Sequence, residues 1–383
     1  FDFNSKQPQV LLEGLSGISV NADRSKMAYA LGPQIHIVPM APGAQPGQGR
    51  VNTDAVEATI DPRAEWYQIF NECWRYMRDN FYDPNFGGVD WNAMKARYQA
   101  YLPYITHRSD LNYVLGMMIG ELGTGHAYVG GGDMGQTRPG FPTGRLGADF
   151  EDVNGKIKIT KIYRGEAWDS GVRGPLTEPG LNVKAGDYLL EIDGRAVGGQ
   201  VTPEELLINK VGRNVVLTVN SSPTLTGSRK ITVRPIGSEG EIRYDDWVET
   251  NRKKVLAMSD GKIGYAHVPD TSEPGMIGFI RGYYASSDKQ AFLIDERFNG
   301  GGMIPTYFFE KLLRTSTTAL RPRNGADVAF PTQLFEGPSA MLINEYAGSG
   351  GDMFPWLFRA HKVGKLIGTR TWGGLVGIAG SAP

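Results

Sequence analysis

The sequence predicts a multidomain α+β protein whose last domain contains a mainly parallel sheet. A chain of 383 residues exceeds one ordinary domain, so several are expected. The hydrophobic pattern changes along the chain: residues alternate at 15–39, follow a helical spacing at 61–122, and form strand-like and helix-like segments in turn after residue 262. These changes predict four parts, with boundaries at 1–50, 51–140, 141–237 and 238–383.

The first part is predicted to form short antiparallel strands. In "LSGISVNADRSKMAYALGPQIHIVP", apolar and polar residues alternate on both sides of an "NADRS" turn. The segment resembles one blade of a β-propeller, and a single blade cannot bury its own faces. A Pro- and Gly-rich linker follows at 41–49. The start of the chain has no signal-peptide pattern. Since the chain begins without Met and ends abruptly at "GLVGIAGSAP", we expect it to be a piece of a longer protein.

The second part is predicted to be helical. An Asp61-Pro62 opening begins a segment with its large apolar side chains on one face, and "RSDLNYVLGMMIGEL" repeats this pattern. Aromatic side chains at this spacing are typical of a core rather than of a binding surface. The glycine-bounded stretch "GTGHAYVGGGD" ends the helical pattern and carries His126.

Composition excludes several classes of function. The formal net charge of −1 gives no electrostatic reason to bind nucleic acid or an anionic membrane. No apolar run reaches the roughly 18 residues that a membrane span requires. The single cysteine, Cys73, can form neither an internal disulfide nor a thiolate metal site. We therefore expect a cytoplasmic protein without a metal or another cofactor.

The third part is predicted to be a compact β-rich module, and it resembles a PDZ domain. The resemblance rests on "GRLGADFE", on the corner "GEAWDSG" and on the hairpin "GDYLLEIDG". In that family the backbone amides of the first loop receive a peptide's C-terminal carboxylate. The resemblance assigns this role to the loop formed by Arg145, Leu146, Gly147 and Ala148. The alternative is a PDZ domain that only packs between its neighbours.

The fourth part is predicted to be an α/β domain. After a linking stretch with strand character, apolar strands such as "KIGYAHVP", "QAFLIDERF" and "SAMLINEY" alternate with helices expected near 275–287, 303–314 and 352–361. This alternation favours a mainly parallel sheet with its functional sites at the carboxyl ends of the strands. "NGGG" (299–302) and Ser349 both lie at such ends.

Ser349 is a candidate nucleophile, because it lies among glycines between a strand and a helix. The alternative is an ordinary helix cap. A serine nucleophile needs a base, and the chain contains five histidines. His36, His107 and His361 are expected to be structural, which leaves His126 and, as its rival, His267. "NGGG" can supply amides to an oxyanion or to a phosphate, but without GK[ST] or a second GxGxxG a nucleotide site is disfavoured.

Three segments together resemble the catalytic core of the tricorn protease family: "DERFNGGG", "LINEYAGSGGD" and "GKLIGTRTWGGLVGI". The resemblance implies a crotonase/ClpP-like α/β domain, with Ser349 as nucleophile, His126 as base, and the amides of Gly301 and Gly350 as oxyanion hole. It also implies short peptide substrates from a proteasome-like degrader, and a hexamer. Related carboxy-terminal processing proteases use a lysine base. The matching residue here is Arg370, whose guanidinium stays protonated.

The chain departs from the family pattern at two places. Gly125 stands where the family has a serine before the catalytic histidine, and the glutamate that orients the pair would lie beyond Pro383. The alternative function is therefore a non-catalytic, PDZ-containing scaffold that binds peptides. In the family an acidic residue supplies the negative charge that binds basic substrate side chains, and it aligns here with Leu320. No Asp or Glu lies between Leu320 and Asp327, so we expect substrates with Lys or Arg to be disfavoured.

Overall fold

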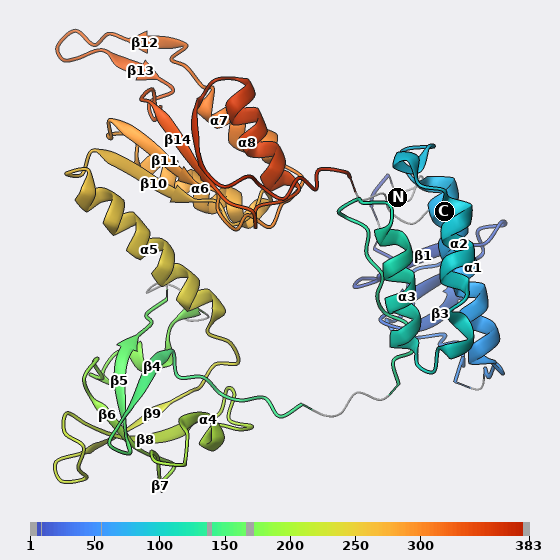
Figure 1. Cartoon of the computed structure of the whole chain (residues 1–383), viewed down its shortest axis with the longest axis horizontal. Helices are drawn as coiled ribbons and strands as arrows, with labels where there is room; N and C mark the ends of the chain where they lie inside the picture. Colours follow the sequence, from blue (N-terminus) through green and yellow to red (C-terminus); the bar gives the residue numbers. More distant parts are fainter. Residues whose placement is uncertain (1–5, 9, 55, 136–139, 166–171, 378–383) are drawn as a thin grey trace. The chain divides into compact units, whose positions relative to one another are not determined.

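A computed structural model describes residues 6–8, 10–54, 56–135, 140–165 and 172–377. The chain forms two compact units, Phe1–Cys73 and Trp74–Pro383, and each is described by itself. Figure 1 shows the elements in chain order. Among the described helices, none has both the length and the hydrophobicity needed to cross a bilayer.

The first unit contains a small antiparallel sheet, as predicted. Its order is β1-β2-β3, formed by β1 (Gly17–Val20), β2 (Lys26–Leu31) and β3 (Gln34–Pro39). One face is buried around Met27, Tyr29 and Val38. Ile18 on β1 and Ile35 on β3 remain 63% and 50% exposed, so the small sheet buries only part of its apolar side chains.

The predicted helical part consists of α1 (Pro62–Asn80), α2 (Trp91–Gln99) and α3 (Arg108–Gly120), with short 3-10 turns at Phe86–Gly88 and Leu102–Tyr104. Two tryptophans tie α1 to α2, because each indole N–H donates to the other residue's carbonyl, at 2.9 Å from Trp74 and 3.0 Å from Trp91. His107 caps α3 in a capping box with Asp110, so its role is structural.

The PDZ-like module is an antiparallel sheet of order β4-β5-β6-β8-β9, with β7 paired to β6. Its elements are β4 (Ala148–Val153), β5 (Lys156–Ile162), β6 (Tyr188–Ile192), β7 (Arg195–Ala196), β8 (Val215–Asn220), β9 (Arg229–Val233), the one-turn helix α4 (Pro203–Leu206) and a 3-10 turn at Pro175–Thr177. Apolar side chains from all five main strands form one core. β4 is an edge strand. Most of the predicted "GEAWDSG" corner, 166–171, lies outside the described residues.

The last domain contains a fully parallel sheet of order β10-β11-β14-β15, which confirms the predicted α/β pattern (Figure 1). Its strands are β10 (Ile263–His267), β11 (Ala291–Asp295), β14 (Ser339–Ile343) and β15 (Gly364–Gly368). Its helices are α6 (Glu273–Ala285), α7 (Pro305–Leu312) and α8 (Gly350–Ala360), and a hairpin of β12 (Thr318–Leu320) and β13 (Val328–Phe330) is added. The helices and strands share a core rich in buried phenylalanines.

The linking stretch before this domain was expected to have strand character, and that prediction is wrong. Residues Gly240–Met258 form a 19-residue helix, α5, which packs against β10. The segment contains two Glu, two Arg and two Lys, which favour helices, and its only buried residue is Ile242. Because most side chains of this segment are polar and only Ile242 is buried, the sequence shows no clear helical spacing of apolar residues, and the helix was missed.

Candidate active site

Three loops meet at the carboxyl edge of the parallel sheet. They follow β10, β11 and β14, and contain Thr271, the 299–302 glycine turn and Ser349, respectively. Backbone hydrogen bonds join them: the Thr271 N–H donates to the Gly301 carbonyl at 2.8 Å, and the Gly348 N–H donates to the Asn299 carbonyl at 3.0 Å. Sites in parallel sheets form at this edge, so the structure places the predicted glycine turn beside the predicted serine.

Ser349 lies on a strained turn directly before α8. Its backbone has φ 58° and ψ −116°, which a residue with a side chain rarely adopts. The Asp352 carboxylate holds the turn, because its Oδ2 accepts a hydrogen bond from the Ser349 N–H at 2.8 Å. Strain of this kind persists where the surroundings enforce it, and it is typical of an exposed nucleophile between a strand and a helix.

The glycines around Ser349 are required by close packing. A Cβ on Gly350 would lie 2.0 Å from Thr271 Oγ1 and 2.4 Å from the Gly302 carbonyl oxygen. A Cβ on Gly351 would lie 2.9 Å from the Glu296 carboxylate, and one on Gly348 would lie 2.6 Å from the Trp372 ring. These close approaches at Gly348, Gly350 and Gly351 leave no room for a side chain at the positions on either side of Ser349.

The two predicted oxyanion amides differ in their availability. Within the described residues, the Gly350 N–H has no hydrogen-bond partner, as expected for the first residue of a helix. Gly301 lies against the serine, since a Cβ there would be 2.7 Å from Ser349 Cβ. However, its N–H donates to Asn299 Oδ1 at 2.8 Å. Of this pair, the Gly350 amide alone lacks a partner among the residues that the structure describes.

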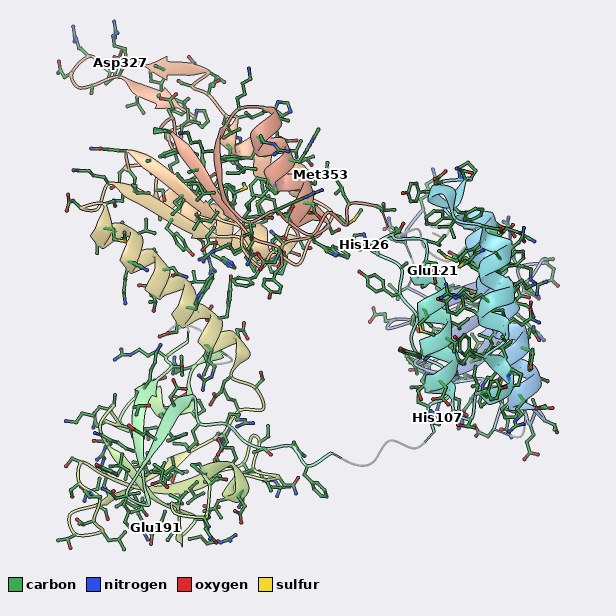
Figure 2. The ribbon with its side chains drawn as sticks, in the orientation of Figure 1. His107, Glu121, His126, Glu191, Asp327 and Met353 are labelled. Carbon is green, nitrogen blue, oxygen red and sulfur yellow. The ribbon has the colours of Figure 1, made fainter. Side chains whose placement is uncertain are left out.

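His126 also has a left-handed backbone, with φ 48°, in the loop after α3 (Figure 2). Its Nδ1 forms a short hydrogen bond with the Val376 carbonyl. Because a carbonyl can only accept, this bond places the proton on Nδ1 and leaves Nε2 as the basic nitrogen of the neutral ring. A backbone carbonyl thus orients the predicted base.

Trp372 connects His126 to the serine turn. Its ring contacts the His126 ring edge-on, with centroids 5.3 Å apart and an interplanar angle of 78°. The backbone N–H of Trp372 donates to the Ala347 carbonyl at 2.9 Å. A Cβ on Gly125 would lie 2.8 Å from the same ring, so the glycine that departs from the family pattern makes room for Trp372. No hydrogen bond joins Ser349 and His126 within the described part of the chain.

The other histidines are engaged elsewhere. His267 is 5% exposed, its Nδ1 pairs with the Tyr244 hydroxyl at 2.6 Å, and its Nε2 donates to the Arg297 carbonyl at 2.9 Å. Burial lowers the pKa of His267. His36 stacks on Tyr29, and His361 packs against Phe309 at the end of α8. These contacts favour His126 over its rival His267 as the base.

Two carboxylates near Ser349 were missed by the sequence reasoning. Besides holding Ser349, Asp352 accepts a hydrogen bond from the Gly373 N–H at 2.7 Å, which ties the turn to the segment carrying Trp372. Glu296 is fully buried, and within the described residues neither carboxylate oxygen has a hydrogen-bond partner. Burial, followed by the nearby charges of Asp352 and Asp295, raises the pKa of Glu296 to about 10. Glu296 stands inside "DERFNGGG", but nothing local in that motif shows that it is buried.

The predicted peptide-binding loop of the PDZ module is already engaged by the chain itself. Leu146 and Ala148 are buried, and Arg145 exchanges two backbone hydrogen bonds with Ile236. The Gly147 N–H donates to Glu239 Oε1 at 2.7 Å.

Leu320 and Asp327 belong to the β12–β13 hairpin, where Figure 2 labels Asp327. Leu320 is 59% exposed. The Asp327 carboxylate pairs with Arg321 at 2.6 Å, so its charge is already compensated. The role of this hairpin in substrate selection stays a prediction. No group of three or more possible metal-ligating side chains occurs among the described residues.

Comparisons with known proteins find both family models for three parts of the chain and relatives along nearly all of it. Three family models match in order: the Tricorn protease C1 domain at residues 62–120, the Tricorn protease PDZ domain at 144–238 and Peptidase family S41 at 262–383. The Tricorn protease homolog of Saccharolobus solfataricus is 33% identical over 99% of this chain and 35% of its own length. The Tricorn protease of Thermoplasma acidophilum is 32% identical over 99% of this chain and 35% of its own length.

The solved crystal structure of the tricorn protease aligns with a TM-score of 0.85 and 31% identity. The alignment covers 95% of this chain and 35% of that one. The chain therefore spans about a third of the length of these relatives.

Proposed function

Because the chain belongs to the tricorn protease family, as the part with the C1, PDZ and peptidase S41 domains, we propose that it hydrolyses peptides through an acyl-enzyme on Ser349. The observation that carries this proposal is the backbone of Ser349. It combines a φ of 58° with a position directly before the free Gly350 N–H at the start of α8. An unpartnered N–H is common to the start of every helix, but an ordinary cap residue has an extended backbone, so the left-handed φ of Ser349 is the feature that a helix cap does not need and a nucleophile on a tight turn does.

In the proposed reaction, His126 Nε2 takes the proton of the Ser349 hydroxyl as Oγ attacks the substrate carbonyl. The negative oxygen that forms accepts a hydrogen bond from the Gly350 N–H. The protonated His126 then gives its proton to the leaving amine, and water hydrolyses the acyl-enzyme by the same steps in reverse roles. The Val376 carbonyl keeps Nδ1 protonated throughout, and so keeps Nε2 as the reacting nitrogen.

Two rearrangements are needed to reach this reacting state. Trp372 contacts both His126 and the serine turn, so we assign the approach of His126 to Ser349 to a shift of this ring. The Gly301 N–H must also leave Asn299 Oδ1 if it is to serve as the second oxyanion donor. Catalytic hydrogen bonds often tighten only when substrate binds, so both changes are assigned to substrate binding.

The wider context of the activity is also part of the proposal. The family resemblance supports short peptides from a proteasome-like degrader as substrates, a hexameric assembly and a cytoplasmic location. The alternative, a non-catalytic scaffold that binds peptides through its PDZ domain, is disfavoured by the engagement of Gly147 with Glu239.

Labelling with a fluorophosphonate probe tests the proposal on the full-length protein. We expect the wild-type protein and the control Ser287→Ala, at an exposed serine, to be labelled, and Ser349→Ala to be unlabelled. His126→Ala should slow labelling by orders of magnitude, because the hydroxyl loses its base. Labelling of Ser349→Ala would contradict Ser349 as the nucleophile. A wild-type protein that neither labels nor cleaves peptides would contradict the peptidase and favour the scaffold.

A further inference from the structure

The carboxylate-binding loop of the PDZ domain contains a carboxylate from the same chain. Glu239, directly before α5, accepts a hydrogen bond from the Gly147 N–H at 2.7 Å. A second amide of the loop, that of Arg145, donates to the Ile236 carbonyl at 2.8 Å. Loop amides of this kind capture the C-terminal carboxylate of a peptide. Here they hold a side-chain carboxylate and a backbone carbonyl instead.

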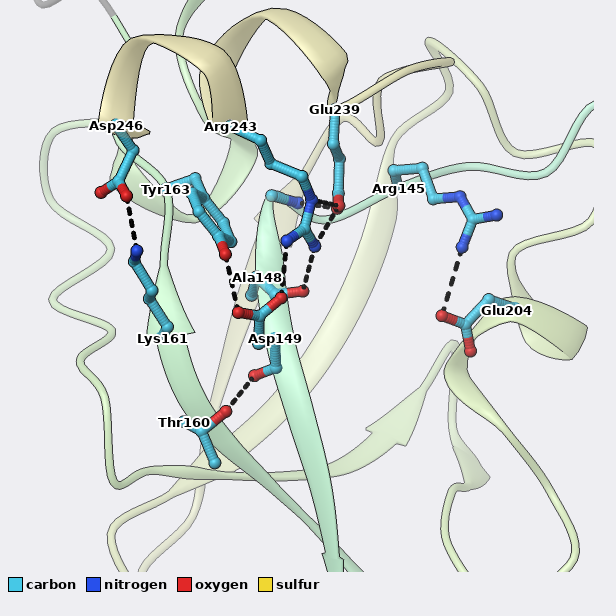
Figure 3. Close-up of polar contacts among 11 residues, drawn as sticks. Arg145, Ala148, Asp149, Thr160, Lys161, Tyr163, Glu204, Glu239, Arg243 and Asp246 are labelled. Carbon is cyan, nitrogen blue, oxygen red and sulfur yellow. Dashed lines mark hydrogen bonds and ion pairs between the residues drawn. The ribbon is translucent and has the colours of Figure 1, made fainter. Parts of the chain in front are cut away.

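Glu239 is held by an ion-pair network that also reaches the edge strand β4 (Figure 3). Arg243 Nε donates to Glu239 Oε2 at 2.8 Å, and its Nη1 donates to Asp149 Oδ1 at 2.7 Å. The Tyr163 hydroxyl donates to the other Asp149 oxygen at 2.7 Å, and its ring stacks under the guanidinium at 4.2 Å. Burial opposes ionisation of Asp149, but these hydrogen bonds outweigh it and lower its pKa. The Glu239 side chain is only 12% exposed.

An apolar contact and a second ion pair accompany the carboxylate. Ile242 is 2% exposed and packs on the loop, since a Cβ on Gly147 would lie 3.0 Å from its Cδ1. Asp246 pairs with Lys161 on β5 at 2.5 Å. Glu239, Ile242, Arg243 and Asp246 have the spacing i, i+3, i+4 and i+7, which places them on one face of a helix. The face supplies a carboxylate and an adjacent apolar side chain, the two features that such a loop accepts from a peptide end.

We propose that this face of α5 is the built-in ligand of the PDZ domain, which therefore clamps α5 instead of capturing free peptide C-termini. A ligand on the same chain competes at an effective concentration in the millimolar range or above, which exceeds that of most free peptides. Since α5 also packs against β10, the clamp connects the PDZ domain to the parallel sheet that carries the candidate site. The proposal does not depend on the peptidase activity, because it concerns contacts outside the Ser349 turn.

Hydrogen exchange measured by mass spectrometry tests the clamp in the whole chain. Glu239→Ala should accelerate exchange of the loop at 145–148 and of the first turns of α5 by about tenfold or more, because the Gly147 N–H loses a charged acceptor. Glu239→Gln keeps one acceptor oxygen but loses the charge that pairs with Arg243, so its effect should be intermediate. The matched control is Glu204→Ala, since Glu204 pairs with Arg145 of the same loop at 3.3 Å but its side chain is 47% exposed. It should leave exchange unchanged.

Peptide binding provides the second measurement. A fluorescent peptide with a free, apolar C-terminal residue is titrated against the wild-type protein, with its C-terminally amidated form as control. We expect no difference between the two peptides, because Glu239 already occupies the loop. The proposal is overturned if the free carboxylate binds the wild-type PDZ domain specifically. It is also overturned if Glu239→Ala leaves exchange at the loop and at α5 the same as in the Glu204→Ala control.

Discussion

Replacing Glu296 by Gln should stabilise the parallel-sheet domain more strongly as the pH rises. In the unfolded chain this carboxyl titrates near its usual value of 4.5, whereas its pKa is about 10 in the folded domain. Below about pH 4.5 both states hold the proton, and the group has no effect on the free energy of unfolding. Above that pH the unfolded chain ionises while the folded domain keeps the proton, so wild-type stability falls until the pH approaches the folded pKa.

The expected magnitude follows from the linkage between proton binding and unfolding. Between pH 5 and 8 nearly one proton separates the two states, so the free energy of unfolding falls by about 1.4 kcal/mol per pH unit, or about 4 kcal/mol in all. Gln has a similar shape and does not ionise. The stability difference between Glu296→Gln and wild type should therefore grow by about 4 kcal/mol over this range, or roughly 10 °C in the midpoint of thermal unfolding.

The measurement must separate this domain from its neighbours, because two-state unfolding is not expected of a chain with several domains. Hydrogen exchange of peptides from β11 and α8, recorded in increasing urea at each pH, gives the stability of the parallel-sheet domain alone. Glu336→Gln, at an exposed position of the same domain, controls for the loss of one negative charge. A stability difference that is constant between pH 5 and 8 would refute the reasoning, because Glu296 would then be ionised in the folded domain.

Three further predictions concern the candidate site. Asp352→Asn should lower kcat of the full-length protein by about tenfold with little change in KM. The reason is that Asn offers only one acceptor oxygen to the two N–H groups of Ser349 and Gly373. An unchanged kcat in steady-state assays would contradict this positioning role. Gly350→Ala should destabilise the domain by roughly 1–3 kcal/mol or more and abolish fluorophosphonate labelling, because its Cβ would lie 2.0 Å from Thr271 Oγ1. Its control is Gly116→Ala in α3, where a Cβ meets open space and Ala should stabilise by up to about 1 kcal/mol. Matched fluorogenic peptides ending in Arg, Phe or Leu should give the lowest kcat/KM for Arg, because Asp327 already pairs with Arg321 and so does not offer its charge to a basic substrate side chain. A preference for Arg would reveal an acidic group elsewhere in the pocket.

The local pattern of the sequence was enough to predict the type of most elements and the location of the serine turn. Strand, turn and helix depend on residues close in sequence, so the alternation at 15–39, the helical spacing at 61–122 and the glycines around Ser349 all had a recognisable form. The helix α5 was missed, because a surface helix with a single buried anchor, Ile242, has almost no apolar period. The roles of Ser349 and His126 came from the family resemblance, and they remain proposals.

Only the tertiary structure decided which groups surround these residues. Glu296 reads as an ordinary acidic residue until β11, β14 and α8 enclose it, and its raised pKa follows from that burial. Trp372 follows a strand in the sequence, but in the fold it contacts His126, 246 positions earlier (372 − 126). Likewise, 92 positions separate Gly147 from the Glu239 carboxylate that fills its loop. Each of these features depends on contacts between distant segments, which no local pattern encodes, because burial and charge pairing are properties of the folded chain.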